Sequence, residues 1–264
     1  MWIDVVFRYE QKARCDVRVT MEFTSPKSEL VLPFHYTEWL QAAIYHSMGN
    51  PVAQAVHDTG FPVDKRSLKL FTFSRLLGKY RANRETLTLY FPLKLVIASP
   101  LTMMIQELVN AIIVRSEFRL GPERLTLSTV AMDKTELNRT HIRVRTLSPL
   151  STHSTLKKGD GSTYTVYYHP REREFSHYVT QNLLRKYQAI HGEPWWTQDA
   201  PHVHVQPCSE PKMNLVYYKD TIIKGYSGAF DISGPPELLQ IGWDAGFGDR
   251  NSQGFGLVDA AGGR

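Results

Sequence analysis

A glycine-rich segment in the second half of the chain has the composition of an anion-binding loop. It runs from residue 246 to residue 256 as Gly-Phe-Gly-Asp-Arg-Asn-Ser-Gln-Gly-Phe-Gly. Glycines let a backbone approach an anion closely and adopt dihedral angles that a Cβ atom forbids. The dinucleotide-binding fingerprint, however, needs a third glycine where Asn251 stands. The loop therefore does not match a nucleotide site, and it is either a tight structural turn or a cradle for the backbone of a polyanion.

Three side chains in the first half have types that suit acid–base chemistry. Tyr45 lies at the edge of the apolar face of a predicted helix, and Lys69 stands at the start of a predicted strand. His57 falls in the last turn of a second predicted helix, beside Asp58. A helix C-terminus and a carboxylate both favour the imidazolium form, which suits a general acid. Each side chain also has an ordinary structural explanation: a packed tyrosine, a capping histidine and a charged strand end.

The charge distribution favours an anionic partner. The 264-residue chain carries a formal net charge of +5. Residues 1–148 contain 20 basic and 14 acidic residues, whereas residues 149–264 contain 11 and 12. Such an excess favours binding to nucleic acid or to a membrane surface. Because no apolar run has the length of a transmembrane helix and no signal pattern is present, we expect a cytoplasmic protein without a membrane partner.

Neither cysteines nor histidines form a metal-binding pattern. Cys15 and Cys208 lack the spacing of a redox or metal-ligand pair, and the ten histidines include no His-Glu-x-x-His. His202 and His204 fall on one face of a predicted strand, where surface histidines are the simpler explanation. We therefore predict no cofactor and no bound metal.

Hydrophobic periodicity predicts two units of similar order. In the first half we predict strands at 17–23, 69–74, 86–91, 93–98, 125–133 and 141–147, with helices at 37–48, 50–60 and 101–115. In the second half we predict strands at 163–168, 202–206, 214–218, 225–232 and 255–259, with helices at 174–191 and 235–243. This order is that of ferredoxin-like (RRM-like) domains with open antiparallel sheets. The prediction is an α+β chain with tandem domains at 1–147 and 148–264, and with an RNA-holding groove between them.

Several stretches resemble the CRISPR-associated endoribonucleases that cut repeat RNA, Cas family six of the repeat-associated RNA-binding superfamily. They are Leu-Gln-Ala-Ala-Ile-Tyr at 40–45, Val-His-Asp at 56–58, Lys-Leu-Phe-Thr-Phe-Ser at 69–74, Arg-Thr-Leu-Ser-Pro at 145–149 and the glycine-rich loop. Residues 1–16 do not match clearly. The resemblance implies metal-independent cleavage, in which the ribose 2′-OH attacks the adjacent phosphorus and leaves a 2′,3′-cyclic phosphate and a 5′-OH.

Carried over residue by residue, the family's catalytic set implies Tyr45, His57 and Lys69, with His46 and His35 as alternative histidines. A fixed cation at Lys69 would stabilise the dianionic phosphorane. The rival interpretation is a non-catalytic RNA-binding subunit of a CRISPR effector complex. The implied partner is CRISPR repeat RNA, and the resemblance also allows a homodimer and association with an effector complex.

The predicted RNA contacts combine the glycine-rich loop with nearby basic residues. They are Gly246, Gly248, Arg250, Asn251, Ser252, Gly254, Gly256, Arg75, Arg143, Arg145, Lys157 and Lys158.

Overall fold

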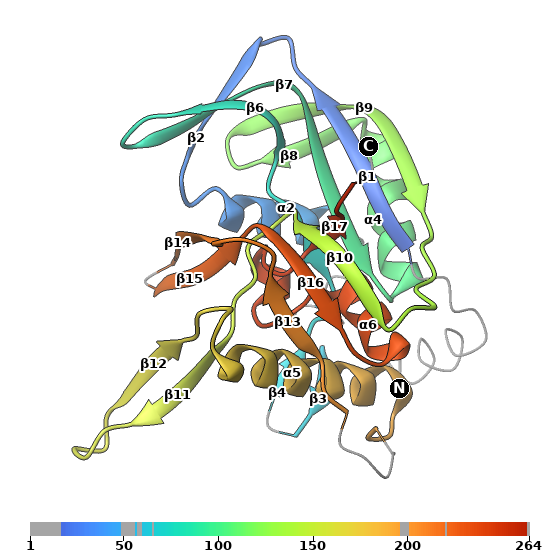
Figure 1. Ribbon diagram of the computed structural model, residues 1–264. Helices are drawn as coiled ribbons and strands as arrows, with labels where there is room; N and C mark the ends of the chain where they lie inside the picture. Colours follow the sequence, from blue (N-terminus) through green and yellow to red (C-terminus); the bar gives the residue numbers. More distant parts are fainter. Residues whose placement is uncertain are drawn as a thin grey trace.

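The computed structural model describes residues 17–48, 56, 60–64, 66–195, 201–219 and 221–262, and they form an α+β protein with antiparallel sheets (Figure 1). The first sheet has the order β2-β7-β1-β9-β8, with β5 and β6 also paired to β7. Its strands are β1 (Val17–Thr24), β2 (Glu29–Pro33), β5 (Thr72–Phe73), β6 (Leu77–Ala82), β7 (Thr86–Ser99), β8 (Glu117–Leu120) and β9 (Glu123–Asp133). The predicted α+β class is confirmed.

Two helices, α2 (Thr37–Ser47) and α4 (Thr102–Arg115), pack on one face of the first sheet. Strand alternation explains which face is covered, because every second residue of β1 and β7 points the same way. Met21 of β1 pairs with Leu95 of β7, and both are buried in one core with Leu40 of α2 and Leu108 of α4. This core fixes the position of α2, which carries Tyr45.

The second sheet has the order β13-β16-β10-β17 and packs with α5 and α6. Its elements are β10 (His141–Thr146), β13 (His204–Pro207), β16 (Ala229–Ser233), β17 (Val258–Ala260), α5 (Arg173–His191) and α6 (Pro236–Ala245). Three hairpins lie outside the two sheets: β3 (Phe61–Val63) with β4 (Arg66–Leu68), β11 (His153–Lys157) with β12 (Thr163–Tyr167), and β14 (Lys212–Tyr218) with β15 (Thr221–Ser227). A short 3-10 helix, η2 (Asn251–Gln253), lies within the glycine-rich loop. The β11–β12 hairpin extends away from the body of the molecule (Figure 1).

The two halves contact each other across the second face of the first sheet. Val96 and Ala98 of β7 are buried there against Leu257. Arg18 of β1 is buried at the same junction. Its guanidinium donates to the main-chain oxygen of Trp243 at 3.2 Å and lies 4.2 Å from the centre of the Trp243 indole ring. The first sheet is therefore covered on its second face at β1 and at the end of β7.

Three predictions of strand continuity or pairing differ from the structure, and the strand predicted at 69–74 is shorter, since β5 covers only Thr72–Phe73. The strands predicted at 86–91 and 93–98 are one strand, β7. Pro92 does not break it, because β2 pairs with residues 86–90, β1 pairs with residues 93–99, and the pairing with β6 shifts register between Tyr90 and Lys94, so Pro92 is left out of all three ladders. The strand predicted at 225–232 is split between β15, which pairs with β14, and β16, which pairs with β10.

The third difference concerns β10, which the sequence order places last in the first unit. In the structure β10 pairs with β16 and β17, so it belongs to the second sheet. Alternating Ile142 and Val144 indicate a half-buried strand but not which sheet it joins. The domain boundary at residues 147 and 148 stays a prediction. Most of the helix predicted at 50–60, including His57, lies outside the described residues.

No helix in the described part of the chain combines the length and the apolar character needed to cross a membrane.

Candidate functional site

A cavity of about 440 Å³ lies where the first half, α5 and the glycine-rich loop meet. One wall is the segment 66–71, which includes Arg66 and Lys69. The rest of the lining comes from His153, from Asn182 and Lys186 of α5, and from residues 245 and 249–253. Four basic side chains line the cavity, Arg66, Lys69, Lys186 and Arg250, together with the carboxylate of Asp249. This charge balance suits a phosphodiester group.

The glycine-rich loop is folded tightly onto the protein. The four glycines Gly246, Gly248, Gly254 and Gly256 all have φ between +76° and +85°. A Cβ atom on Gly248 would lie 2.4 Å from the main-chain oxygen of Ser151, and a Cβ on Gly256 would lie 2.3 Å from that of Phe247. These glycines are therefore required by the fold itself, which favours the structural-turn interpretation at these positions.

Many of the loop's backbone N–H groups already have partners within the protein. The N–H of Phe247 donates to Gly256, that of Asp249 to Ser151 at 2.7 Å, and that of Gly256 to Pro149 at 2.9 Å. Two more, on Gln253 and Gly254, donate inside the loop. These five groups are not available to an RNA phosphate. Contacts between this loop and RNA must therefore come largely from side chains. The predicted RNA contacts of the loop stay predictions.

Lys186 holds the loop in place from α5. Its ammonium donates to the main-chain oxygens of Ala245 at 3.1 Å and Gly246, and to Oδ1 of Asn251 at 2.7 Å. Three acceptors match the three protons of an ammonium group. Burial lowers the pKa of Lys186 to about 7, and the nearby Asp249 carboxylate opposes that shift. No short motif marks Lys186, although a lysine three positions after Leu183 on the apolar face of a helix is a signal of a buried cation.

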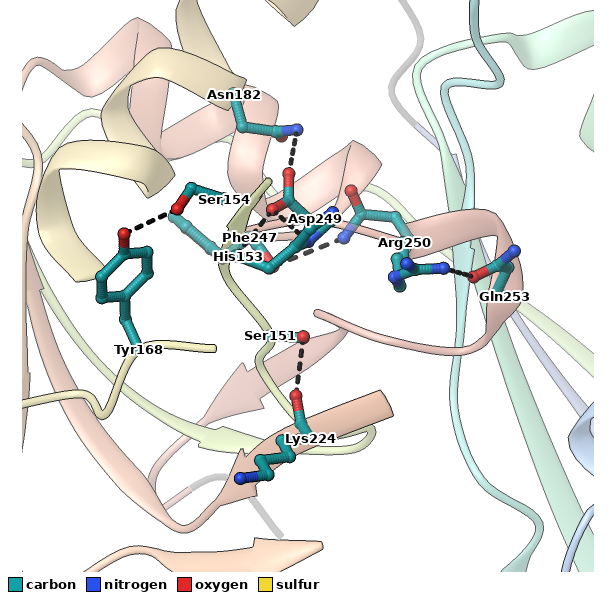
Figure 2. A network of polar contacts seen from close by, with 11 residues as sticks. Ser151, His153, Ser154, Tyr168, Asn182, Lys224, Phe247, Asp249, Arg250 and Gln253 are labelled. Atoms are coloured by element: carbon teal, nitrogen blue, oxygen red, sulfur yellow. Dashed lines mark hydrogen bonds and ion pairs between the residues drawn. The ribbon is translucent and has the colours of Figure 1, made fainter. Parts of the chain in front are cut away.

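His153 and Asp249 form a second polar cluster on the cavity wall. Figure 2 shows Asp249 between Asn182 and His153. The imidazole Nδ1 of His153 lies 3.0 Å from Oδ2 of Asp249, and the main-chain N–H of His153 donates to the same oxygen at 3.1 Å. Asn182 donates to the other carboxylate oxygen at 3.3 Å. No sequence motif links His153 to Asp249, because 96 residues separate them.

Tyr45 and Lys69 both lie near Phe71: Lys69 precedes it by two residues in the chain, and Tyr45 contacts its ring. Lys69 lines the cavity, and its Nζ donates to Oγ of Ser67 at 3.4 Å. Tyr45 packs edge-on against Phe71 with ring centres 5.6 Å apart. Burial, followed by the neighbouring Tyr218, raises the pKa of Tyr45 above its ordinary value. A tyrosine in that environment holds its proton and is a poor base near neutral pH.

Helix α2 is anchored to the loop one turn before Tyr45. Gln41 donates to the main-chain oxygen of Ser252 at 2.6 Å and accepts a hydrogen bond from the hydroxyl of Tyr218. The alternative histidines lie elsewhere: His46 is exposed with its Nδ1 2.6 Å from the main-chain oxygen of Ala42, and His35 is exposed against the Trp39 ring. Neither lines the cavity.

The other predicted RNA contacts lie on β10, in the β11–β12 hairpin and between β5 and β6. Arg143 forms two hydrogen bonds of 2.9 Å with Asp231, whose pKa this contact lowers to about 2, and Arg145 bonds Asp259 at 3.1 Å. Lys157 and Lys158 are exposed at the end of the β11–β12 hairpin, and Arg75 is partly buried. These residues do not line the cavity, and their contacts with RNA stay predictions.

Two family models match almost the whole described chain. "CRISPR-associated protein Cas6, N-terminal" matches residues 31–131, and "CRISPR associated protein Cas6, C-terminal" matches residues 132–260. The chain belongs to the Cas6 family. Among its Cas6 relatives, the CRISPR-associated endoribonuclease Cas6 of Pyrococcus furiosus is 26% identical over 245 residues, which cover 88% of this chain and 84% of that protein. The CRISPR-associated endoribonuclease Cas6 1 of Methanocaldococcus jannaschii is 25% identical over 86% of this chain and 87% of its own length.

Solved Cas6 structures share the fold. A Cas6-related protein from Pyrococcus furiosus superposes with a TM-score of 0.81 at 21% identity, covering 94% of this chain and 100% of that one. A structure described as an RAMP protein binding different RNA substrates gives a TM-score of 0.78 at 20% identity, covering 93% and 99%. The predicted tandem ferredoxin-like architecture of a Cas6 protein is thereby confirmed.

Substitution of Gly248 by alanine should destabilise the fold by about 3 kcal/mol, because the added Cβ meets the Ser151 carbonyl and the left-handed φ is strained. Gly159 is the matched control, since a Cβ there meets nothing within 4 Å. Thermal unfolding should show a lower Tm for Gly248→Ala and an unchanged Tm for Gly159→Ala. Equal melting of the two variants would mean that the loop does not need its glycine for folding.

Proposed function

We propose that this Cas6-family chain is an endoribonuclease that cleaves CRISPR repeat RNA and so matures guide RNA. The observation that carries the proposal is the match of both Cas6 models across residues 31–260, together with relatives that are named CRISPR-associated endoribonucleases. The cavity supports it, because Arg66, Lys69 and Arg250 surround a space into which a phosphodiester group fits.

The proposed reaction is a transesterification in which the RNA supplies its own nucleophile. The 2′-oxygen bonds to the adjacent phosphorus, the bond from phosphorus to the 5′-oxygen breaks, and a 2′,3′-cyclic phosphate and a 5′-OH result. His57 protonates the departing 5′-oxygen as the general acid. Lys69 stabilises the charge that develops on the phosphorane, a role that its place on the cavity wall supports.

The rival function is a non-catalytic RNA-binding subunit of a CRISPR effector complex. A relative from Pyrococcus horikoshii, 21% identical over 246 residues, is named an endoribonuclease-like protein. For this reason we retain the RNA-binding subunit as the alternative function. A homodimer and association with an effector complex stay predictions.

One incubation separates the two functions. The protein is mixed with repeat RNA from its own genome in excess EDTA, and the RNA is resolved on denaturing and native gels. The proposed function predicts one discrete cut with a cyclic phosphate on the 5′ fragment. RNA that is retarded on the native gel but remains intact would support the rival, and a cut that needs added magnesium would contradict the proposed chemistry.

Replacing Lys69 by alanine should lower the single-turnover cleavage rate by about ten- to a hundredfold while repeat affinity changes by a few-fold, because one transition-state cation is lost. Lys69→Arg should restore part of the rate. Lys27→Ala is the control, since that exposed lysine pairs with Glu123 away from the cavity. Tyr45→Phe, which keeps the ring contact with Phe71, should cost less than Lys69→Ala. A full rate for Lys69→Ala would remove the lysine from the catalytic set.

A further inference from the structure

One stripe of helix α2 contacts the second half of the chain. Glu38, Gln41 and Tyr45 follow one another at steps of three and four residues, so they lie on the same side of the helix. All three are partly buried. Oε1 of Glu38 accepts a hydrogen bond from the main-chain N–H of Lys219, and burial followed by the neighbouring Tyr218 raises the pKa of Tyr45. This stripe therefore holds α2 against the end of β14.

Gln41 uses both ends of its amide in this contact. The amide nitrogen Nε2 donates to the main-chain oxygen of Ser252 at 2.6 Å. A carbonyl oxygen can only accept, so this bond fixes which end of the amide is the nitrogen, and Oε1 accepts from the hydroxyl of Tyr218. Tyr218 is buried, and burial followed by the Glu38 carboxylate raises the pKa of its hydroxyl. The proton that this second bond requires therefore stays in place near neutral pH.

Ser252 belongs to the part of the glycine-rich loop that lines the cavity. Thr72 of β5 also donates to the loop, at 2.8 Å to the main-chain oxygen of Phe255, but Phe255 does not line the cavity. Arg250 lines the cavity at the start of the same short turn, η2, and its Nη1 donates to Oε1 of Gln253 at 3.2 Å. A displacement of η2 would therefore move the Arg250 guanidinium with it.

We propose that Gln41 is a positioning residue of this site and that Tyr218 fixes the orientation of its amide. The inference rests on the proposed function. Gln41 stands one helical turn before Tyr45 and bonds the turn that carries Arg250, so it sets the placement of a side chain of the proposed catalytic set relative to a cavity cation from the other half. Many charged contacts along the backbone hold a bound RNA, whereas the reaction depends on the placement of a few groups. Loss of this contact therefore lowers the cleavage rate more than the affinity.

The test is single-turnover cleavage at saturating RNA by Gln41→Met, which keeps the length of the side chain without its amide, and by Tyr218→Phe, which loses only the hydroxyl. We expect Gln41→Met to be about ten- to a hundredfold slower and Tyr218→Phe about three- to tenfold slower, with repeat affinity within a few-fold. The matched controls are Gln106→Met on α4 and Tyr217→Phe on β14, because both side chains are exposed and lie outside the cavity. Both controls should cleave at the wild-type rate.

The double variant Gln41→Met/Tyr218→Phe distinguishes a positioning pair from two independent structural contacts. If Tyr218 acts through Gln41, loss of the hydroxyl has no further effect once the amide is gone. The double variant should therefore cleave within about twofold of the rate of Gln41→Met alone. Rate losses that multiply in the double variant would contradict the role of Tyr218. Thermal unfolding of each variant shows whether the protein is folded at the assay temperature.

Each outcome decides. If the wild type cleaves and both single variants keep its rate at saturating RNA, the positioning role is wrong while the proposed function stands. Weaker binding with an unchanged saturating rate would make Gln41 a binding residue, and a rate that falls only in proportion to the folded fraction would make it a structural one. Either result overturns the inference. If Gln41→Met does not fold, Tyr218→Phe with its Tyr217→Phe control replaces it. No cleavage by the wild type would overturn both proposals together.

Discussion

Replacing His57 by alanine should slow single-turnover cleavage of repeat RNA by about two to four orders of magnitude, the usual contribution of a positioned acid or base. The reason is the leaving group: a 5′-alkoxide is a strong base, and it leaves readily only when an acid delivers a proton to it. Repeat affinity, measured by gel shift, should stay within a few-fold, because one neutral or singly charged side chain contributes little to binding along a polyanion.

His46→Ala and His35→Ala are the comparison variants for His57. Both histidines are exposed and neither lines the cavity, so both variants should cleave at the wild-type rate. A full rate for His57→Ala together with a loss in either of the other two would transfer the acid role to that histidine.

Replacing Lys186 by methionine should lower the stability of the whole fold by about 3 kcal/mol, because three buried oxygen acceptors lose their donor. For a chain of this size, that corresponds to a fall in Tm of roughly 6–12 °C. Lys212→Met is the control, since that lysine is exposed on β14, and its Tm should stay close to the wild type. A wild-type Tm for Lys186→Met would show that the lysine does not hold the loop.

The effect of Lys186 on stability should also depend on pH. The unfolded lysine keeps its proton up to about pH 10.4, whereas burial lowers the folded pKa to about 7. Between these values the unfolded chain binds more protons, so the stability due to Lys186 rises with pH. The difference in Tm between the wild type and Lys186→Met should therefore be larger at pH 9 than at pH 7. A smaller difference at pH 9 would contradict the lowered pKa.

Local patterns predicted most of the long elements. The helices at 37–48, 101–115 and 174–191 correspond to α2, α4 and α5, because each has an apolar face of helical period and clear ends. The same patterns did not reveal pairing partners. The position of β10 in the second sheet depends on its contacts with β16 and β17, which follow it by more than 80 residues.

The site was predictable only where a motif lies within a short stretch. Lys69 and the glycine-rich loop were found in this way, and both line the cavity. His153, Asn182 and Asp249 were not linked by the sequence, because folding brings them together from three separate elements. The glycines were recognised as special, but their composition alone could not separate a cradle for phosphate from a turn that is packed against Ser151.

A repeat RNA with a single 2′-deoxy substitution immediately upstream of the scissile phosphate tests whether the substrate supplies its own nucleophile. Because the 2′-oxygen of that nucleotide is the proposed nucleophile, the substituted RNA should bind with unchanged affinity and should not be cut. The unmodified RNA, in EDTA, should be cut and should carry a 2′,3′-cyclic phosphate on its 5′ fragment. Cleavage of the deoxy RNA at the same position would contradict the account, because the nucleophile would then come from outside the substrate.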